Sequence, residues 1–352
     1  MDRAQTAYIA SLGLATPPFR VEQKMAGEIL ANQYADRLSK RNLAITRNLF
    51  NHPSIRYRSY AIDDPESLFN ESPDARVARF TRWSVDLAAE AAARALDDAR
   101  VDINALKGIV VNTCTGYICP GISTYLIEKL GLSKNICAYD LAGSGCGGAI
   151  PNLQLSGALA GRLNGPVVSV SVEICSATFQ MDNVPSLIVS NALFGDGAAA
   201  AVIRNIPGGF ELTDSASICV PGEREHIRYV HKNGELHNQL SMNLHLYVKK
   251  AAASVVDDLL SRNLLKKTDI DHWALHTGGE KIINAIRDEI GLSEEQLAAT
   301  RLILSDYGNM SSPTVLFVLK KLDEAGINKG DWCVMLSFGA GLSAHAYLLK
   351  KG

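Results

Sequence analysis

The sequence predicts an α/β protein. Short apolar runs that suit buried strands alternate with amphipathic stretches that suit helices along the whole chain. No low-complexity linker interrupts the 352 residues, and a composition that is 47% hydrophobic suits a globular protein with one large core or two fused ones. These observations exclude a disordered or collagen-like chain.

The first element is expected to be a strand from Tyr8 to Ala15. This apolar stretch follows a charged start, so the segment has a weak likeness to a secretory signal peptide, but Pro17 and Pro18 end it as they would end a strand. The charged region 36–74 has no clean periodicity, and we expect loops or short helices there.

Further elements follow along the rest of the chain. Strands are predicted over residues 108–112, 136–141, 167–172, 198–203 and 333–337, and helices over 84–99, 123–130, 249–263 and 281–290. The segment NIPGG at 205–209 carries turn residues directly after one of these strands. It predicts a boundary between an N-terminal half, 1–205, and a C-terminal half, 206–352.

The overall charge and the cysteines restrict the partners and the compartment. The formal net charge is -2 at pH 7, so no overall basic field favours nucleic acid or an anionic membrane. No uncharged apolar run reaches the about 18 residues that a spanning helix needs. The 7 cysteines are an odd number and lack the dense pattern of secreted disulfide scaffolds. We therefore expect a cytoplasmic enzyme with no nucleic-acid or membrane partner.

The segment DLAGSGCGGAIPNL, residues 140–153, surrounds Cys146 with small residues directly after a predicted strand. A sharp turn from strand to helix would explain this composition and would place the thiol at a helix N-terminus, where unpaired amides favour an anion. An ordinary thiol is only about 3% ionised at pH 7, whereas a pKa of about 6 makes it roughly 90% ionised. Cys146 is therefore a candidate nucleophile, with a buried structural cysteine as the alternative.

The same glycines allow a second interpretation. Gly143, Gly145 and Gly148 match the G-x-G-x-x-G pattern of dinucleotide-binding turns. That motif also requires an acidic residue about 20 positions later. The chain there reads RLNGPVV, which contains no acidic residue. A dinucleotide-binding or regulatory module is therefore a remote alternative.

Two residues in the second half complete a possible catalytic set. His276 ends the strand-like run in HWALHTGG, and Asn309 lies in DYGNMSSPTV, before small hydroxyl residues that would start a helix. On its own, each residue could be structural. His276 could be a buried histidine with hydrogen-bonded ring nitrogens, and Asn309 could be a helix cap or a turn residue. Together with Cys146 they are the side chains that decarboxylating acyl transfer requires. Cysteine accepts an acyl group from a thioester, histidine pairs with the thiolate, and histidine and asparagine N–H groups hold an enolate oxygen.

Four segments in this order, DLAGSGCGGA, NALFGDGAAA, HTGGEKII and DYGNMSSPTVLF, resemble the corresponding segments of chalcone synthase-like type III polyketide synthases. The resemblance is strongest from residue 108 to the C-terminus and weak over the first hundred residues. It implies the thiolase fold, in which two duplicated halves form a five-layer αβαβα sandwich, and a homodimer. It also places Cys146, His276 and Asn309 on the nucleophile, histidine and asparagine of the family.

The resemblance further assigns residues to substrate binding. Phe194 corresponds to an aromatic residue that gates the junction of the coenzyme A tunnel and the cavity. Cys119 corresponds to the residue that the family inserts across the dimer interface. Cysteine at two of these positions, one of them Cys114, is more typical of bacterial members of the family than of plant members. The substrate-binding residues implied in this way are Cys114, Thr115, Cys119, Cys175, Thr178, Phe194, Phe338 and Gly339.

The sequence departs from the family pattern at three places. Ala340 replaces a proline in the glycine-rich loop SFGAGLS, and the segment GELHNQLSMNLHLYV has no aromatic residue that we can assign as a second gate. Only Arg47, His52 and Lys281 are candidates for binding the coenzyme A phosphates, and a solvated surface position is the alternative for each.

The sequence therefore predicts a type III polyketide synthase, an acyltransferase with coenzyme A thioesters as substrates and no permanently bound cofactor. An acyl-CoA starter would load Cys146, and malonyl-CoA would extend it by decarboxylative Claisen condensation before release or cyclisation. The segments DIDHWALHTGGEKII and DYGNMSS resemble bacterial dihydroxyphenylacetyl-CoA synthases, which use only malonyl units. The alternative is a ketoacyl synthase III-like condensing enzyme that takes malonyl groups from acyl carrier protein.

No metal site is predicted. The histidines at 226, 231, 237 and 245 are spaced by five, six and eight residues, which fits no short metal-ligand motif.

Overall fold

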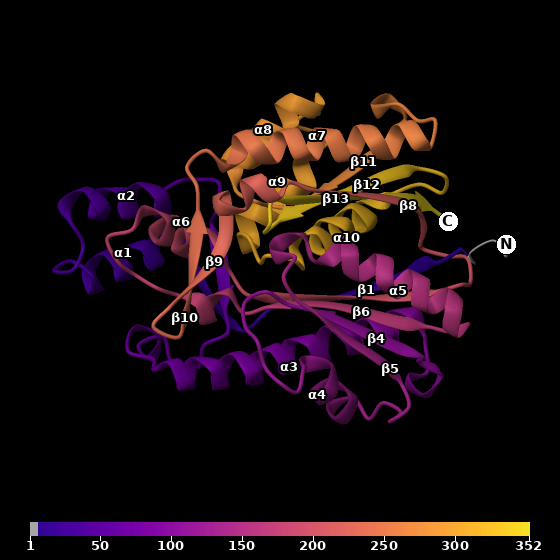
Figure 1. The fold of residues 1–352 in the computed structure, drawn as a ribbon, viewed down its shortest axis with the longest axis horizontal. Helices are drawn as coiled ribbons and strands as arrows, with labels where there is room; N and C mark the ends of the chain where they lie inside the picture. Colours follow the sequence, from indigo (N-terminus) through magenta and orange to yellow (C-terminus); the bar gives the residue numbers. More distant parts are fainter. Residues whose placement is uncertain (1–5) are drawn as a thin grey trace.

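The computed structural model describes residues 6–352, which are arranged in five layers (Figure 1). Two groups of strands are separated by a central layer of helices, and each group is covered on its outer face by further helices. This is the αβαβα sandwich that the resemblance implies, and the predicted α/β class is confirmed.

The first group of strands comes from the N-terminal part of the chain. Its strands are β1 (Tyr8–Ala15), β4 (Gly108–Asn112), β5 (Cys137–Leu141), β6 (Val167–Glu173) and β7 (Gly197–Arg204). They lie in the order β1-β7-β6-β4-β5, with β4 parallel to β5 and β6, and β7 antiparallel to β6 and β1. Every residue of β4 and β6 is buried, and both strands are mostly apolar; their polar residues are Asn112, Ser169, Ser171 and Glu173.

The second group comes from the C-terminal part. Its strands are β8 (Phe210–Cys219), β11 (His272–Leu275), β12 (Trp332–Gly339) and β13 (Ser343–Lys351). They lie in the order β11-β12-β13-β8. A short pairing of β1 with β8 joins the two groups into one 9-stranded sheet. The turn 205–209 carries the chain from one group to the other; the division into halves 1–205 and 206–352 stays a prediction.

Three layers of helices pack on these strands (Figure 1). The central layer contains α5 (Ala149–Leu163) and α10 (Thr314–Gly326), with α9 (Ala298–Tyr307) beside it. The outer layers are α3 (Pro73–Ala99) with α4 (Ile122–Lys129) on the first group, and α7 (Leu244–Arg262) with α8 (Glu280–Ile290) on the second.

Smaller elements gather at one end of the sandwich, on the left of Figure 1. The strands β9 (Ile227–Lys232) and β10 (Glu235–Leu240) form a hairpin. Near it lie the helices α1 (Gln23–Gln33), α2 (Lys40–Phe50) and α6 (Pro185–Leu193). A second pair of strands, β2 (Phe19–Glu22) and β3 (Tyr57–Tyr60), completes this region.

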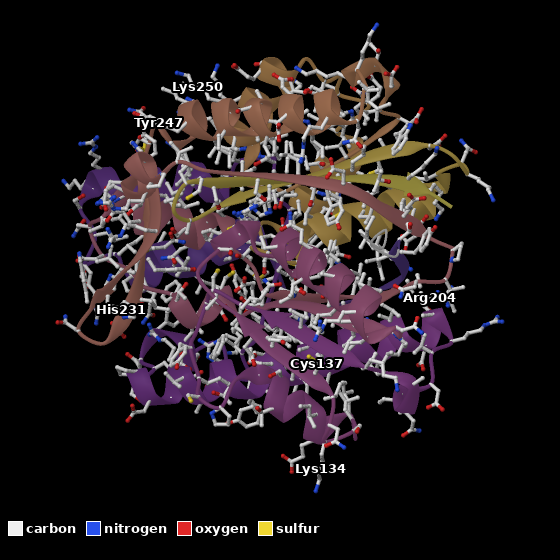
Figure 2. The ribbon with its side chains drawn as sticks, turned by 45° about the vertical axis from the view of Figure 1, so that its right-hand side comes forward. Lys134, Cys137, Arg204, His231, Tyr247 and Lys250 are labelled. Carbon is white, nitrogen blue, oxygen red and sulfur yellow. The ribbon has the colours of Figure 1, made fainter. Side chains whose placement is uncertain are left out.

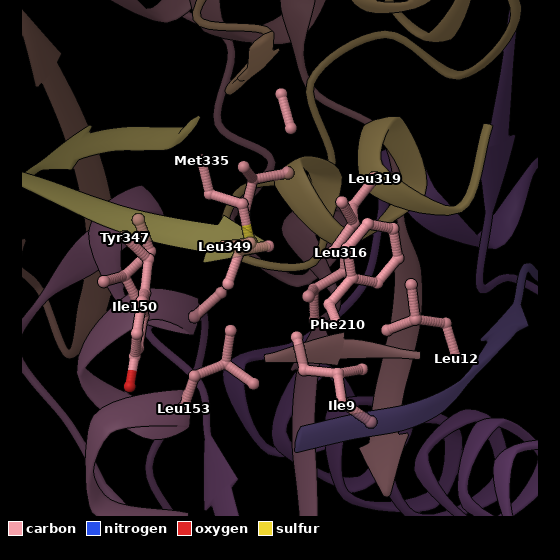
Figure 3. Packing of buried hydrophobic residues seen from close by; sticks show 14 of the residues in the cluster. Ile9, Leu12, Ile150, Leu153, Phe210, Leu316, Leu319, Met335, Tyr347 and Leu349 are labelled. Carbon is pink, nitrogen blue, oxygen red and sulfur yellow. The ribbon is translucent and has the colours of Figure 1, made fainter. Parts of the chain in front are cut away.

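The hydrophobic cores lie between the layers. The central core joins β1, α5 and α10 to the inner face of the second group, and Figure 3 shows Ile9, Ile150, Leu316 and Leu349 converging there. Two further clusters pack α3 and α4 on the first group of strands and α7 and α8 on the second. Each group of strands is therefore buried on both faces, which holds the ends of its strands in place.

Most predicted elements are confirmed. In the region 36–74, where loops or short helices are expected, residues 57–60 form a strand, β3, that the sequence did not predict. Residues 40–50 form a helix of 11 residues, which the expectation of short helices allows. Its buried face carries Asn42 and Thr46 together with Phe50, so no apolar stripe marks it in the sequence. Ser39 caps this helix by accepting a hydrogen bond from the backbone N–H of Asn42.

Among residues 6–352, no helix combines the length and the apolar character that crossing a membrane requires.

Candidate active site

Cys146 lies on a tight turn between β5 and α5. The turn is the 3₁₀ helix η3 (Gly145–Gly147), and α5 starts two residues after it. Gly145 has a φ of 55°, which is costly for other residues, and a Cβ on Gly339 would lie 2.3 Å from the carbonyl oxygen of Ser144. The small residues around Cys146 therefore allow the turn to pack directly on the end of β12.

These contacts also explain the G-x-G-x-x-G pattern. Gly143 and Gly145 both have positive φ, and a Cβ on Gly148 would lie 2.8 Å from Nδ2 of Asn112. Each glycine thus has a reason in the backbone geometry or the packing of the turn, so the pattern gives no support for dinucleotide binding.

His276 follows β11 at the point where the chain turns into α8. Its side chain is fully buried, and its ring stands edge-on to Phe338 with the ring centroids 5.0 Å apart. Neither ring nitrogen has a hydrogen-bond partner within residues 6–352. Burial lowers the pKa of His276 to about 3, so the imidazole is neutral at pH 7.

Asn309 is held by backbone contacts on both sides. Its N–H donates to the carbonyl oxygen of Leu193 at 3.0 Å, and its own carbonyl accepts from Gly195 at 3.0 Å, so a bridge pairs it with Phe194. Its side-chain Oδ1 accepts from the backbone N–H of Ser311 at 2.7 Å, and its side chain also hydrogen-bonds to Cys146. The Asn309 side chain is therefore placed at the sulfur.

A second residue of the same loop also reaches the sulfur. Ser311, with a φ of 60°, has its Oγ 3.3 Å from Sγ of Cys146, 3.3 Å from Sγ of Cys114 and 3.3 Å from Oε1 of Glu173. Glu173 is fully buried at the end of β6. Sequence reasoning missed both Ser311 and Glu173; the only signal was an acidic residue at the end of an otherwise apolar strand.

The thiol of Cys146 does not gain a low pKa from its position. Burial raises the pKa of Cys146 to about 12, against the effect of the hydrogen bond from Ser311. The thiolate expected from a helix N-terminus is therefore not favoured by that position alone. Burial therefore opposes both a thiolate at Cys146 and an imidazolium at His276.

A cavity of about 380 Å³ reaches Cys146. It is lined by Cys114 and Phe194, as predicted from the resemblance. Residues of the β9–β10 hairpin also line it. A smaller cavity of about 90 Å³ lies on the other side of Phe194 and is lined by Cys175 and Thr178. His276 and Asn309 line neither of these two cavities and are buried, with 0% and 2% of their surface exposed.

The other predicted substrate-binding residues line neither cavity. Thr115 is buried, and its N–H and Oγ1 both donate to Glu173, at 3.1 and 2.9 Å. Phe338 is buried against His276, and Gly339 lies beneath the Cys146 turn. Cys119 is exposed on this single chain.

The three candidates for coenzyme A binding lie on the surface. His52 pairs with Glu280 at 3.3 Å, so it lies beside Lys281, the next residue of α8. Arg47 lies in the last turn of α2, five residues before His52. The structure thus places His52 beside the first turn of α8, whose second residue is Lys281.

The four clustered histidines do not converge. His226 stacks on Tyr247 with ring centroids 4.0 Å apart, whereas His231 lies toward the tip of the hairpin, away from Tyr247 (Figure 2). In the described part of the chain, no three His, Cys, Asp or Glu side chains group as a metal site would require.

Comparisons with known proteins agree with this geometry. The models of the N-terminal and C-terminal domains of chalcone and stilbene synthases match residues 4–207 and 211–351. A 3,5-dihydroxyphenylacetyl-CoA synthase of Streptomyces toyocaensis is 30% identical over 86% of this chain and 82% of its own length. A phloroglucinol synthase of Pseudomonas fluorescens is 26% identical over 93% of this chain and 94% of its own. The crystal structure of PKS-I from the brown algae Ectocarpus siliculosus matches with a TM-score of 0.89 and 26% identity over 100% of both chains.

Fold and site together define a condensing enzyme of the thiolase fold. The chain belongs to the chalcone and stilbene synthase family, and it is a type III polyketide synthase, an acyltransferase that acts on coenzyme A thioesters. The resemblance read from the four sequence segments is confirmed.

Proposed function

We propose that Cys146 carries the growing acyl chain and that His276 and Asn309 are its catalytic partners. The observation that supports this most directly is that the Asn309 side chain and the Ser311 hydroxyl both hydrogen-bond to the Cys146 sulfur, at the inner end of a 380 Å³ cavity. A buried thiol with these neighbours, in a chain whose buried His276 imidazole has no hydrogen-bond partner within residues 6–352, matches the requirements of an acyl-accepting nucleophile.

Loading starts when His276 takes the proton of the Cys146 thiol. The sulfur attacks the carbonyl carbon of an acyl-CoA, the bond to the coenzyme A sulfur breaks, and the departing thiolate takes the proton back from the imidazolium. The products are an acyl thioester on Cys146 and free coenzyme A.

Extension uses malonyl-CoA. Its carboxylate leaves as carbon dioxide, and the electron pair forms an enolate whose oxygen accepts hydrogen bonds from His276 and Asn309. The enolate carbon attacks the thioester on Cys146, forms the new carbon–carbon bond and releases the Cys146 sulfur. The chain, longer by two carbons, is then attached to coenzyme A and either returns to Cys146 or leaves, with or without cyclisation.

The remaining assignments extend this proposal. Arg47, His52 and Lys281 bind the phosphates of coenzyme A, and Phe194 controls passage into the cavity. The enzyme works as a homodimer in the cytoplasm, and Cys119, exposed on the single chain, contributes to the interface. The resemblance to dihydroxyphenylacetyl-CoA synthases supports malonyl-CoA as both starter and extender.

Intact-protein mass spectrometry tests the role of Cys146. Incubation with malonyl-, acetyl- or longer acyl-CoA should add one acyl group to the wild-type protein and none to Cys146→Ala, while Cys175→Ala should be loaded like the wild type. Absence of an adduct with every starter, together with unchanged turnover in Cys146→Ala, would overturn the proposal. A second candidate, the ketoacyl synthase III-like enzyme, is separated by supplying malonyl carrier protein in place of malonyl-CoA. It predicts faster extension from the carrier protein.

A further inference from the structure

The hydroxyl of Ser311 has one proton and two possible acceptors. Its Oγ lies 3.3 Å from Sγ of Cys146 and 3.3 Å from Oε1 of Glu173. A hydroxyl group has a single O–H donor, so it can serve only one of the two fully. Cys146 therefore has the hydrogen bond from Ser311 only while the proton of Ser311 does not point to Glu173.

Ser312, the next residue of the loop, already occupies Oε1 of Glu173. Its Oγ lies 2.6 Å from Oε1, within the range of about 2.5–2.7 Å that is typical of a hydroxyl bound to a carboxylate. The oxygen of Ser311 is 3.3 Å from the same Oε1, which is longer than an ordinary O–H···O hydrogen bond of about 2.5–3.0 Å. Sulfur is larger than oxygen and accepts at longer distances, so the proton of Ser311 is better placed toward Cys146.

The surroundings of Glu173 suit an ionised carboxylate. Its Oε2 accepts from the backbone N–H groups of Cys114 and Thr115, at 2.9 and 3.1 Å. The hydroxyl of Thr115 donates to it at 2.9 Å, and the oxygen of that hydroxyl accepts from the N–H of Ile174, also at 2.9 Å. An ionised carboxylate binds hydroxyl protons strongly. If Oε1 lost its own donor, it would therefore draw the proton of Ser311.

A chain of buried side chains holds the hydroxyl of Ser312 in its orientation. Asn112, at the end of β4, donates from Nδ2 to Oγ of Ser312 at 2.8 Å, so the oxygen of Ser312 accepts and its proton is left for Glu173. Oδ1 of Asn112 in turn accepts from Nδ2 of Asn152, in α5, at 2.8 Å. Asn112, Asn152 and Ser312 are all buried. Each donor in this chain points toward Glu173.

We propose that Ser312 is a positioning residue for Cys146: by occupying Oε1 of Glu173, it keeps the single proton of Ser311 on the sulfur. The proposal rests on the proposed function, in which Cys146 is the nucleophile. A hydrogen bond to the charged form of a group favours that form, so the bond from Ser311 makes the Cys146 thiolate easier to form. Ser312 contributes to this effect through Ser311.

The test is the pH dependence of Cys146 alkylation. Wild type, Ser311→Ala and Ser312→Ala would be treated with iodoacetamide over a range of pH, and peptide mass spectrometry would give the rate at Cys146. Since a hydrogen bond to a charged group is worth about a factor of ten or more, the rate on the rising part of the profile should fall about tenfold in Ser312→Ala. This equals a shift of the profile by about one pH unit. Ser311→Ala, which removes the donor itself, should show the same shift.

Two comparisons separate this role from a general loosening of the site. The double variant Ser311→Ala/Ser312→Ala should be no slower than Ser311→Ala alone, because Ser312 acts through the proton of Ser311. Ser169→Ala is the matched control: Ser169 is as buried as Ser312 and donates to Oδ1 of Asn152 at 2.7 Å, so it belongs to the same chain of side chains but lies far from Glu173 along it. Its profile should match the wild type. Ser312→Cys, whose thiol is a weaker donor, should shift the profile in the same direction and gives the answer if the alanine variant does not fold.

Three results would overturn the proposal: an unchanged alkylation rate in folded Ser312→Ala or Ser312→Cys, additive effects in the double variant, or an equal loss in Ser169→Ala. Failure of the proposed function is distinguishable, because Cys146 would then take no acyl group from any acyl-CoA in the wild type, whatever its alkylation rate. Acyl loading of Cys146 together with unchanged alkylation in the Ser312 variants would refute the role of Ser312 alone.

Discussion

The Glu173 carboxylate offers the sharpest test of how the nucleophile site is held together. Its Oε2 accepts from the backbone N–H groups of Cys114 and Thr115, at 2.9 and 3.1 Å, and from the hydroxyls of Thr113 and Thr115. Its Oε1 accepts from Ser312 at 2.6 Å and lies 3.3 Å from Oγ of Ser311, whose single proton can be donated either to Glu173 or to the Cys146 sulfur. One buried side chain thus joins the 113–115 loop, which lines the cavity, to the loop that contacts Cys146.

Glu173→Ala should lower the free energy of unfolding by about 2–6 kcal/mol. The hydroxyl groups around the missing carboxylate can rotate toward other acceptors, but the two backbone N–H groups cannot, and each buried unpaired donor costs about 1–3 kcal/mol. Glu173→Gln should cost less by at least about 1 kcal/mol, because its amide oxygen can still accept from both N–H groups. Its NH₂ group must then face Ser312, whose oxygen already accepts from Asn112 at 2.8 Å, so some loss remains.

Urea unfolding followed by circular dichroism measures these differences at one protein concentration. Ser312→Ala is the matched control, since it removes one donor to Glu173 and leaves both N–H groups paired; we expect it to cost less than about 1.5 kcal/mol. The reasoning is refuted if Glu173→Ala lies within about 1 kcal/mol of the wild type, or if Glu173→Gln is the less stable of the two.

Three further predictions concern the proposed catalytic residues Asn309 and His276, and the buried histidine His345. Asn309→Ala should slow malonyl-CoA decarboxylation by about a hundred to a thousandfold, measured as carbon dioxide release, and a near-normal rate would remove Asn309 from its role. His276→Gln should slow alkylation of Cys146 by iodoacetamide at pH 8 at least about tenfold, because burial raises the pKa of the thiol to about 12 and the variant lacks the imidazole proposed to take its proton. Equal alkylation rates would contradict proton transfer to His276. Burial lowers the pKa of His345 from 6.5 to about 4. As the pH falls from 6.5 toward 4, His345 therefore binds a proton in the unfolded chain but not in the native protein. Wild-type stability should therefore fall relative to His345→Gln by up to about 1.4 kcal/mol per pH unit in this window, and a pH-independent difference in urea unfolding would show that His345 does not titrate there.

The parts of the site that could be predicted from the sequence are those that lie on tight turns. Cys146, His276 and Asn309 each stand beside glycines or small residues at the end of a strand or before a helix, because close backbone packing leaves no room for other side chains. Such constraints are local and leave a mark in the sequence. The same reasoning found the buried strands, since a strand covered on both faces is apolar throughout.

The residues that sequence reasoning missed act through partners distant in the chain. Ser311 differs from an ordinary turn serine only because Cys146 and Glu173, 165 and 138 positions away, meet its hydroxyl. Tyr229 lies in the β9–β10 hairpin, where polar and apolar residues are mixed and the sequence indicates no buried face. Only the structure shows that Tyr229 lines the cavity. Helix α2 could be predicted only as one of the short helices of the region 36–74, without its bounds, because its buried face carries Asn42 and Thr46.

The loop 309–312 also links catalysis to the packing of the two groups of strands. Burial opposes a lone charge on Cys146 and on His276, so an ion pair between them is favoured only where other groups stabilise the thiolate. Those groups are the Asn309 side chain and the Ser311 hydroxyl. The loop is fixed to α6 through Leu193, to the first group of strands through Glu173, and to the His276 turn through Thr277, whose Oγ1 donates to the carbonyl oxygen of Gly308 at 3.0 Å. A change that shifts this loop should therefore reduce the reactivity of Cys146 even where Cys146, His276 and Asn309 are all intact.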